Sequence, residues 1–304
     1  MKRLSFVIIA IGLLTAACGT GTGGSLGQAP TNDAKASSPA SQPSTTSPAG
    51  QSSQPSAGPS QGGTSSPTRQ INLQAWFTRN GKLFAGQRSI PATASVGRTA
   101  LESVLAGPTA VEYSASLRSQ IPAGTSLLGL RISAGTATVN LSAAFESAAR
   151  NSTMPLRIAQ VVYTLTQFPT VSGVRFQIGG QAVTVLGGVP VQTRQTRAMF
   201  SSFLPAITVQ SPVIGAQVTS PVTVSGTADV FEAVVSVRVL NAAGHEITRT
   251  FTNASCGTGC RGDYSVAVSF SVPHVERGTV EVFESSAKNG QPVNVQRIPV
   301  TLEP

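Results

Sequence analysis

Three cysteines and two histidines are the side chains of this sequence best suited to redox or metal chemistry. Cys256 and Cys260 flank Gly-Thr-Gly, and in an oxidising compartment such a pair forms a local disulfide that fixes a loop tip. His245 and His274 lie in the same region, so a metal site is an alternative, although the spacing fits no tetrahedral zinc pattern. A pair of free thiols is the third alternative. We expect the disulfide.

Acid–base chemistry has few candidate residues. Residues 69–200 contain no His or Cys, and their carboxylates are Glu102, Glu112 and Glu146. The sequence has no paired acids, no nucleophile–base set, no metal cluster and no phosphate loop. His245 follows Ala-Gly in an expected hairpin turn, which is typical of an exposed histidine. We therefore predict no catalytic residues, no cofactor and no metal.

Residues 1–17 have the order of a secretory signal peptide. Lys2 and Arg3 precede an almost entirely apolar run that ends at Leu14, and small residues follow it. The run is shorter than the roughly twenty residues that a helix needs to span a bilayer. We expect this segment to direct export and then to be removed.

The segment Leu14-Thr15-Ala16-Ala17-Cys18 resembles the bacterial lipobox, with Thr15 where Leu is commoner. The resemblance implies that the Cys18 sulfur is lipidated and that Cys18 becomes the mature N-terminus. Lipid chains suffice as an anchor, because each buried methylene contributes about 0.8 kcal/mol. We expect a palmitate-type lipoprotein on the outer face of the cytoplasmic membrane, lipid-anchored and extracellular. An ordinary secretory signal with an incidental cysteine is the alternative.

Residues 18–68 contain the anchor cysteine and a linker of Ser, Pro, Gly, Thr, Gln and Ala. Asp33 and Lys35 are its only charged residues, and it has no aromatic residue. Such a segment buries too little apolar surface to offset its conformational entropy, so we expect disorder. As a flexible coil of roughly fifty residues it would span about 40 Å.

Residues 69–190 read as an α/β (α+β) domain with helices on one face of a small sheet. Expected helices cover 95–106, which Gly107-Pro108 ends, and 155–168. The strand that begins at Ile71 alternates, and its wetter face carries Trp76 and Thr78. The last two strands form a closing hairpin. The expected strands are 71–78, 126–132, 136–141, 174–178 and 182–186.

After a connector at 191–205, residues 206–304 contain short alternating strands and no helical period. Turn residues separate the strands at fairly regular intervals, which predicts an all-β immunoglobulin-like sandwich. The expected strands are 206–210, 222–226, 234–240, 246–252, 264–270, 279–284 and 295–302.

The first domain resembles the GerMN domain of bacterial sporulation and germination proteins. Asn140 departs from the pattern, because Asp is more usual there. Related GerMN folds resemble ring-building modules, so the resemblance implies a possible homo-oligomer. The matching residues are Ala100-Leu101-Glu102, Leu105, Gly107-Pro108, Ile121-Pro122, Gly124-Thr125, Val139-Asn140-Leu141-Ser142, Thr164-Leu165-Thr166, Phe168-Pro169, Val171, Val174 and Phe176.

The second domain resembles the Gmad-type immunoglobulin-like domain of bacterial spore germination proteins. Phe231 and Phe283 within its motifs are expected in the sandwich core. Glu232 and Glu284 either follow the alternation or form an acidic edge for a partner. The matching residues are Ser211-Pro212, Gly215, Ser220-Pro221-Val222, Gly226, Ala228, Val230-Phe231-Glu232-Ala233, Gly262, Tyr264, Gly278 and Glu281-Val282-Phe283-Glu284.

Charge separates the two regions. Residues 69–200 hold twelve Arg or Lys against three Glu, a net charge of +9, whereas residues 201–304 hold six basic and eight acidic residues, a net charge of −2. The first region is either attracted to anionic lipids or wall polymers, or simply solvated with an arginine bias. Nucleic acid is not expected as a partner, because the chain is exported and has no reader motif. The candidate anion-binding residues are Arg79, Lys82, Arg88, Arg98 and Arg118.

These features predict a membrane-anchored extracytoplasmic lipoprotein that acts as a non-catalytic binding or assembly module. Its contacts would be with envelope proteins or anionic cell-wall polymers. A ligand sensor for a small germinant or sugar is the alternative, and it requires a concave pocket with convergent polar groups. A cell-wall hydrolase is a further alternative, which the missing acid–base set disfavours.

Overall fold

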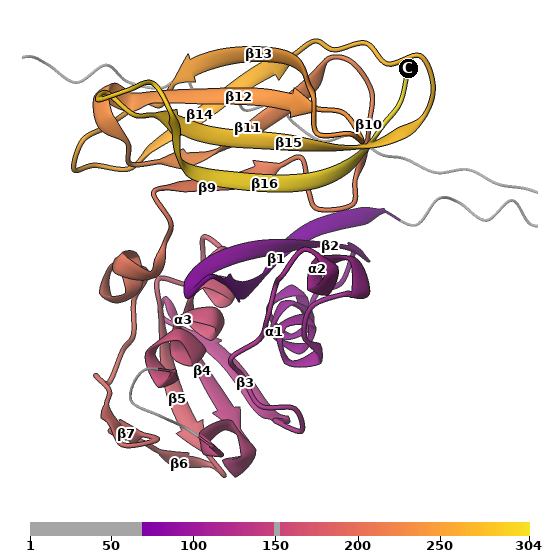
Figure 1. Cartoon of the computed structure of the whole chain (residues 1–304). Helices are drawn as coiled ribbons and strands as arrows, with labels where there is room; N and C mark the ends of the chain where they lie inside the picture. The colour runs from indigo at the N-terminus through magenta and orange to yellow at the C-terminus, as the bar shows by residue number, and fades with distance from the viewer. Residues whose placement is uncertain (1–68, 149–152) are drawn as a thin grey trace, which may run out of the picture. The chain divides into compact units, whose positions relative to one another are not determined.

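The computed structural model describes residues 69–148 and 153–304. The predicted signal peptide, Cys18 and the linker lie outside these residues. Within them, no helix combines the length and the apolar character that crossing a membrane requires. The described chain forms an α/β domain followed by an all-β domain, which confirms the predicted fold class (Figure 1).

The first domain has three layers: a two-stranded hairpin, the helices and a four-stranded sheet. The sheet order is β3-β4-β5-β6, and β4 and β5 are parallel, with α3 as the crossover that a parallel pair needs. The hairpin of β1 and β2 packs on the helices (Figure 1). The elements are β1 (Gln70–Arg79), β2 (Lys82–Pro91), α1 (Val96–Ala106), α2 (Ala110–Ser114), β3 (Leu127–Ser133), β4 (Thr136–Leu141), α3 (Met154–Leu165), β5 (Gly173–Ile178), β6 (Gln181–Ala182), β7 (Val185–Leu186) and β8 (Val189–Pro190).

Helix α3 is buried from Leu156 to Leu165 because it lies between the hairpin and the sheet. Two of its polar side chains, Gln160 and Thr164, form hydrogen bonds with the hairpin backbone. Gln160 Nε2 donates to the Trp76 carbonyl oxygen at 2.9 Å, and the Trp76 N–H donates to Thr164 Oγ1 at 3.1 Å. A buried helix therefore tolerates these two side chains without leaving a donor or acceptor unpaired.

Strand β1 corrects the expectation of a wetter face. Trp76 is 5% exposed and Thr78 is 2% exposed. The Trp76 ring packs against Tyr163 of α3, with ring centroids 4.9 Å apart. The alternation of β1 was visible in the sequence, but the helix that covers it comes almost ninety residues later.

Three local boundaries also differ from expectation. Helix α3 ends at Leu165 rather than 168, where the Thr166 hydroxyl donates to the Val162 carbonyl oxygen at 2.6 Å. The closing hairpin is short, because β5 pairs with only two residues of β6 and β7 pairs with β8 instead. Strand β2 was not expected, since its sequence does not alternate cleanly.

The second domain contains all seven expected strands and one short addition, β10. They form a five-stranded sheet, β10-β16-β15-β12-β13, and a three-stranded sheet, β14-β11-β9 (Figure 1). Buried valines and isoleucines fill the space between the sheets. The strands are β9 (Ile207–Ser211), β10 (Gln217–Val218), β11 (Val222–Ala228), β12 (Val234–Leu240), β13 (Glu246–Asn253), β14 (Gly262–Val268), β15 (Glu276–Ser285) and β16 (Pro292–Leu302).

Tyr264 ties the two edges of the three-stranded sheet together. Its buried hydroxyl donates to the Thr208 carbonyl oxygen at 2.8 Å, across β11. Gly226 of β11 lies beneath this bond, and a Cβ there would overlap Thr208 and the tyrosine hydroxyl. A glycine is needed at this position because of that close approach.

The connector between the domains contains a 3₁₀ helix, Arg197–Phe203. The Arg197 guanidinium lies over the Tyr163 ring at 4.6 Å and donates to the Tyr163 carbonyl oxygen at 2.8 Å. Phe200 is buried. The end of the connector therefore packs on the first domain rather than hanging free.

Candidate binding surfaces

The structure joins Cys256 and Cys260 in a disulfide, as expected. It therefore favours neither free thiols nor a cysteine metal site. His245 and His274 are both exposed, and His245 follows a turn that the Asn241 side chain stabilises. In residues 69–148 and 153–304, no group of three His, Cys, Asp or Glu side chains is arranged to hold a metal ion.

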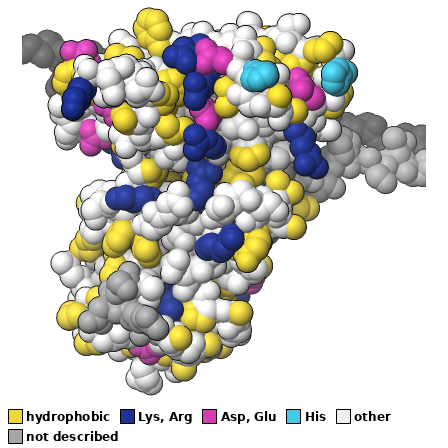
Figure 2. All heavy atoms as spheres, in the orientation of Figure 1, with side chains coloured by type: hydrophobic (Ala, Val, Ile, Leu, Met, Phe, Trp, Pro, Cys, Tyr) yellow, Lys and Arg dark blue, Asp and Glu magenta, His cyan; other side chains and the backbone are white. Residues whose placement is uncertain are grey.

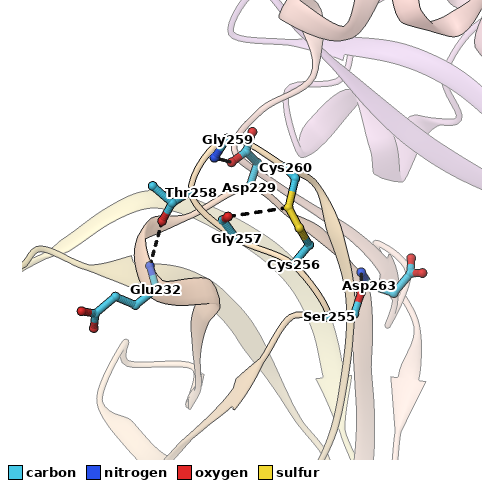
Figure 3. Close-up of a disulfide and its surroundings, with 9 residues drawn as sticks. All are labelled: Asp229, Glu232, Ser255, Cys256, Gly257, Thr258, Gly259, Cys260 and Asp263. Atoms are coloured by element: carbon cyan, nitrogen blue, oxygen red, sulfur yellow. Dashed lines mark hydrogen bonds between the residues drawn. A yellow bond between two sulfur atoms is a disulfide. The ribbon is translucent and has the colours of Figure 1, made fainter. Parts of the chain in front are cut away.

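The disulfide loop clamps a neighbouring turn, residues 229–233 (Figure 3). The Thr258 N–H donates to the Val230 carbonyl oxygen at 2.9 Å, and its hydroxyl accepts from the Glu232 N–H at 3.1 Å. Asp229 Oδ1 accepts from the Gly259 N–H at 2.9 Å. These contacts hold Glu232 at a φ of 52°, a left-handed backbone conformation that residues other than glycine rarely adopt.

The clamped turn corrects one core expectation. Phe231 is 51% exposed, whereas Phe283 is fully buried as expected. Glu284 is engaged within the domain, because its carboxylate accepts from the Phe231 N–H at 3.1 Å and from Asn294 Nδ2 at 2.7 Å. Glu284 therefore supports the turn rather than forming a free acidic edge.

Arg88, one of the five candidate anion-binding residues, has a carboxylate partner inside the protein. Its guanidinium donates to both oxygens of Glu112, at 2.6 and 2.8 Å. Glu112 is 5% exposed and also accepts from the Thr109 N–H at 2.8 Å, which completes a capping box at the start of α2. Because two guanidinium donors of Arg88 are already bonded to this carboxylate, few of its donors are left for an external anion.

Arg98 and Arg118 lie on other parts of the first domain. Arg98 forms an exposed ion pair with Glu102, one helical turn away, at 3.4 Å. The Arg118 guanidinium stacks on the Tyr113 ring at 3.7 Å and donates to the Leu117 carbonyl oxygen at 2.7 Å. Such contacts order the side chains without neutralising Arg118.

Arg79 and Lys82 face each other across the β1–β2 turn. The Arg79 guanidinium lies 4.0 Å from the centre of the Phe84 ring and donates to the Arg297 carbonyl oxygen at 2.9 Å. Burial, and then the nearby Arg297 charge, lower the pKa of Arg79 to about 10. Lys82 donates to the Ser202 carbonyl oxygen at 2.8 Å. That these five residues bind an anionic partner stays a prediction.

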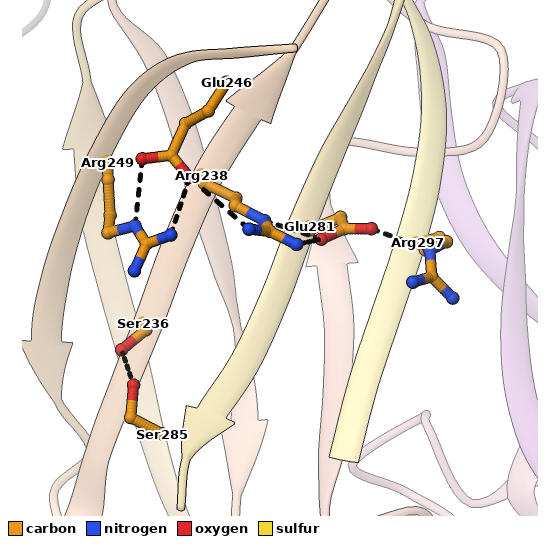
Figure 4. A network of polar contacts seen from close by, with 7 residues as sticks. All are labelled: Ser236, Arg238, Glu246, Arg249, Glu281, Ser285 and Arg297. Atoms are coloured by element: carbon orange, nitrogen blue, oxygen red, sulfur yellow. Dashed lines mark hydrogen bonds and ion pairs between the residues drawn. The ribbon is translucent and has the colours of Figure 1, made fainter. Parts of the chain in front are cut away.

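A row of charged side chains crosses the five-stranded sheet of the second domain (Figure 4). Arg238, Glu281 and Arg297 are direct cross-strand neighbours. The Glu281 side chain is 3% exposed and contacts Arg238 at 2.6 Å and Arg297 at 2.7 Å. Arg249 and Glu246 continue the row, and the Arg249 hydrogen bond lowers the pKa of Glu246. Figure 2 shows blue and magenta side chains in a band across this domain. The row fixes strand register, because a shift by one residue would separate the charges.

The four-stranded sheet of the first domain carries a polar hollow on the face away from the helices. Its volume is about 770 Å³, and none of the residues that line it is acidic or aromatic. Arg131 and Arg175 are its two cations, and neither was predicted from the sequence as a binding residue. Each lies in an expected strand, but strand pairing cannot be read from the sequence. The lining residues are Gly129, Leu130, Arg131, Ser133, Ala134, Thr136, Thr138, Asn140, Arg175, Gln177 and Ala182.

Two family models match the chain in succession. Residues 66–184 match "Germane: Sporulation and spore germination", and residues 206–291 match "Gmad2: Immunoglobulin-like domain of bacterial spore germination". No curated protein matches the sequence.

Two solved structures similar to this chain come from the sporulation protein GerM of Bacillus subtilis. Its first GerMN domain is 25% identical with a TM-score of 0.38, and the match covers 42% of this chain and 98% of that one. The tandem GerMN domains are 16% identical with a TM-score of 0.38, and that match covers 77% of this chain and 61% of the other. The chain therefore has a first region that matches the Germane family model, followed by a second region that matches the Gmad2 immunoglobulin-like family model.

Proposed function

We propose that this protein is a membrane-anchored, extracytoplasmic binding or assembly module of the germination-associated type, without catalytic activity. The two family matches support the association with germination. The lipobox at Cys18 supports the anchor, and the Cys256–Cys260 disulfide is consistent with an oxidising compartment.

The observation that carries the binding role is the unneutralised charge of the first domain. Residues 69–200 have a net charge of +9. Among the basic residues that the structure describes there, Arg88 and Arg98 alone form ion pairs with carboxylates. A surface with this excess of cations attracts anions and concentrates them near the protein. Anionic wall polymers or acidic envelope proteins are the matching partners.

The shape of the polar hollow favours a polymer over a small germinant. Small-molecule sites enclose most of their ligand, usually in an apolar cleft. This hollow lies on the open face of a sheet and is lined by side chains from β3, β4 and β5. An extended chain can lie across such a face, whereas a single sugar would stay largely in water.

Membrane fractionation tests the anchor. The wild-type protein is expected in the membrane fraction, and the Cys18→Ser variant is expected in the medium. Cys256→Ser serves as the control, because it also replaces one cysteine by serine and should stay with the membrane. If Cys18→Ser remains membrane-bound, the proposed lipid anchor is wrong.

Sedimentation velocity of residues 18–304 with Cys18→Ser tests assembly. The homo-oligomeric version of the proposal expects species larger than a monomer that grow as the protein concentration rises. A monomer at every concentration would exclude that version and leave heterologous partners.

A further inference from the structure

The open face of the first domain's sheet has an ordered set of polar side chains. Cross-strand pairing puts Arg131, Thr138 and Arg175 in one row over β3, β4 and β5. Asn140 and Gln177 are paired in the next row, with Gly129 opposite Asn140. Side chains alternate between the two faces of a strand, so these residues share one face.

Burial identifies this face as the one without helices. In β4, the buried residues are Ala137, Val139 and Leu141, which face the core. Thr138 and Asn140 alternate with them and are only half-buried. The face that carries Thr138 and Asn140 is therefore the one turned away from the core, and it is more exposed to solvent.

The two arginines of this face have no carboxylate partner among the described residues. Arg131 and Arg175 are both exposed, and among the described residues the Arg175 hydrogen bond is from Nε to the Thr193 carbonyl oxygen, at 3.4 Å. Its two terminal nitrogens therefore remain available. Since no acidic residue lines the hollow, its cations are not balanced locally.

Arg194 adds a third positive charge at the border of the same face. A Cβ on Gly173, which precedes Arg175 by two residues on the same side of β5, would lie 2.6 Å from Arg194 Nε. The arginine side chain thus crosses the sheet where Gly173 leaves room, and Nη2 donates to the Ser172 hydroxyl. Three cations on one open face repel each other unless an anion lies between them.

We propose that this open face binds a linear anionic glycan, with Arg131 and Arg175 each pairing with an oxyanion of the strand. Neighbouring strands are about 4.8 Å apart, so the two arginines lie roughly 10 Å apart across β4. Guanidinium groups bind carboxylates and phosphates through paired hydrogen bonds. This inference rests on the proposed function and specifies the polymer class and the site.

The polar groups between and beside the arginines match the hydroxyls of a sugar chain. Thr138 lies between the arginines, and Asn140 and Gln177 lie in the next row. Asn140 Oδ1 accepts from the Gly180 N–H at 2.8 Å, which leaves its amide nitrogen as a donor. Gly129 adds no side chain to this row, and one could be introduced without a clash, because its Cβ would lie 3.7 Å from the nearest atom, Asn140 Cβ. Without an aromatic residue in the lining, the face offers no stacking platform for nucleic-acid bases.

Calorimetric titration of residues 18–304 with Cys18→Ser tests the site at physiological salt. The probe is oligogalacturonate, and its methyl ester is the uncharged control ligand. We expect binding of the oligogalacturonate and at least tenfold weaker binding of the ester. Equal binding of the two ligands would overturn the role of the oxyanions, and absence of binding to either would overturn the site.

Matched variants locate the binding. Arg131→Gln with Arg175→Gln should weaken binding at least tenfold, whereas Arg69→Gln with Lys288→Gln removes the same charge from exposed positions and should change it less than twofold. Gly129→Val leaves the charge unaltered but fills the hollow, and it should also weaken binding about tenfold. Asn140→Asp adds a negative charge and should weaken binding while keeping the acceptor for Gly180. Circular dichroism checks that each variant is folded.

The possible outcomes separate the site from general attraction. Equal losses in the two double variants, or no loss in Gly129→Val, would mean that no defined site exists. Tighter binding to phosphatidylglycerol vesicles that displaces the glycan would identify a lipid surface as the partner and overturn the proposal. If the variants bind cell-wall material as well as wild type does, the proposed function stands and this site is wrong.

Discussion

Glu112 shows at the scale of a single residue why charge alone does not locate a binding site. It was one of three carboxylates in a strongly basic region, and the structure buries it against Arg88. The two residues are 24 positions apart, so their pairing depends on how β2 and α2 pack. Arg88 was a candidate for anion binding, but it has an internal anion.

We predict that Glu112→Gln lowers the free energy of unfolding by about 3 kcal/mol. The change leaves the largely buried Arg88 guanidinium without its counter-charge, and breaking a buried pair in this way costs about 3–5 kcal/mol. Glu102→Gln breaks the exposed pair with Arg98 and should cost less than about 0.5 kcal/mol. Urea unfolding of the two variants measures the difference. Similar losses would show that the Arg88–Glu112 pair is not buried as described.

The Tyr264 hydroxyl predicts a loss of stability at alkaline pH. Burial raises its pKa above the ordinary value of about 10. Above pH 10 the unfolded chain releases this proton while the folded protein keeps it, so the free energy of unfolding falls as pH rises. Tyr264→Phe should cost about 1 kcal/mol at neutral pH, because its hydrogen bond is lost, and should show a shallower decline above pH 10.

Urea unfolding between pH 8 and pH 11 measures both effects. Tyr113→Phe is the control for the neutral-pH loss. Because Tyr113 is 57% exposed, this substitution should change the free energy of unfolding by less than about 0.5 kcal/mol. Parallel pH profiles for wild type and Tyr264→Phe would contradict the assignment.

At the scale of elements, local pattern predicted the second domain better than the first. Apolar and polar residues alternate in its seven expected strands, and turn residues separate them. Each of these strands can therefore be predicted from its own residues. In the first domain, β2 lacks clean alternation and β1 is covered on both faces. Trp76 looked half-solvated because Tyr163 and Thr164, which contact it, belong to a distant helix. Thr78 is covered by Arg118 and Gln120, which are also distant in the sequence.

The candidate sites divide in the same way. The disulfide was predictable because both cysteines lie in one short loop. The polar sheet face was not, since Arg131 and Arg175 become neighbours only through the pairing of β3, β4 and β5.

The disulfide should matter to one element, the turn at residues 229–233. Closing so short a loop stabilises the folded protein by about 2 kcal/mol in the chain-entropy estimate. The variant with Cys256→Ser and Cys260→Ser should have a free energy of unfolding lower by about that amount. Amide exchange in the turn at residues 229–233 should also become faster, because Thr258 then loses its fixed position. Hydrogen exchange at the amides of Phe231 and Glu232 measures this. Unchanged protection there would show that the turn holds without the clamp.

At the scale of the whole molecule, the two domains differ in charge and in sheet surface. The first has a net charge of +9 and an unneutralised open sheet face. The second has a net charge of −2, and Arg238, Arg249 and Arg297 of its five-stranded sheet pair with glutamates. We expect the first domain to make the anionic contact and the second to act as a spacer or a second contact. If Cys18 carries the lipid anchor that we propose, the protein would connect the membrane with material outside it.

The most direct test of the binding role is co-sedimentation of residues 18–304, with Cys18→Ser, with isolated cell-wall material at low and at physiological salt. We predict that the protein pellets with the wall at both salt concentrations, because paired guanidinium–oxyanion contacts are screened less than diffuse attraction. If binding disappears at physiological salt, the positive charge of the first domain provides only a nonspecific attraction that salt screens, and no specific wall contact. If the protein stays in the supernatant at both salt concentrations, the wall-binding role is wrong.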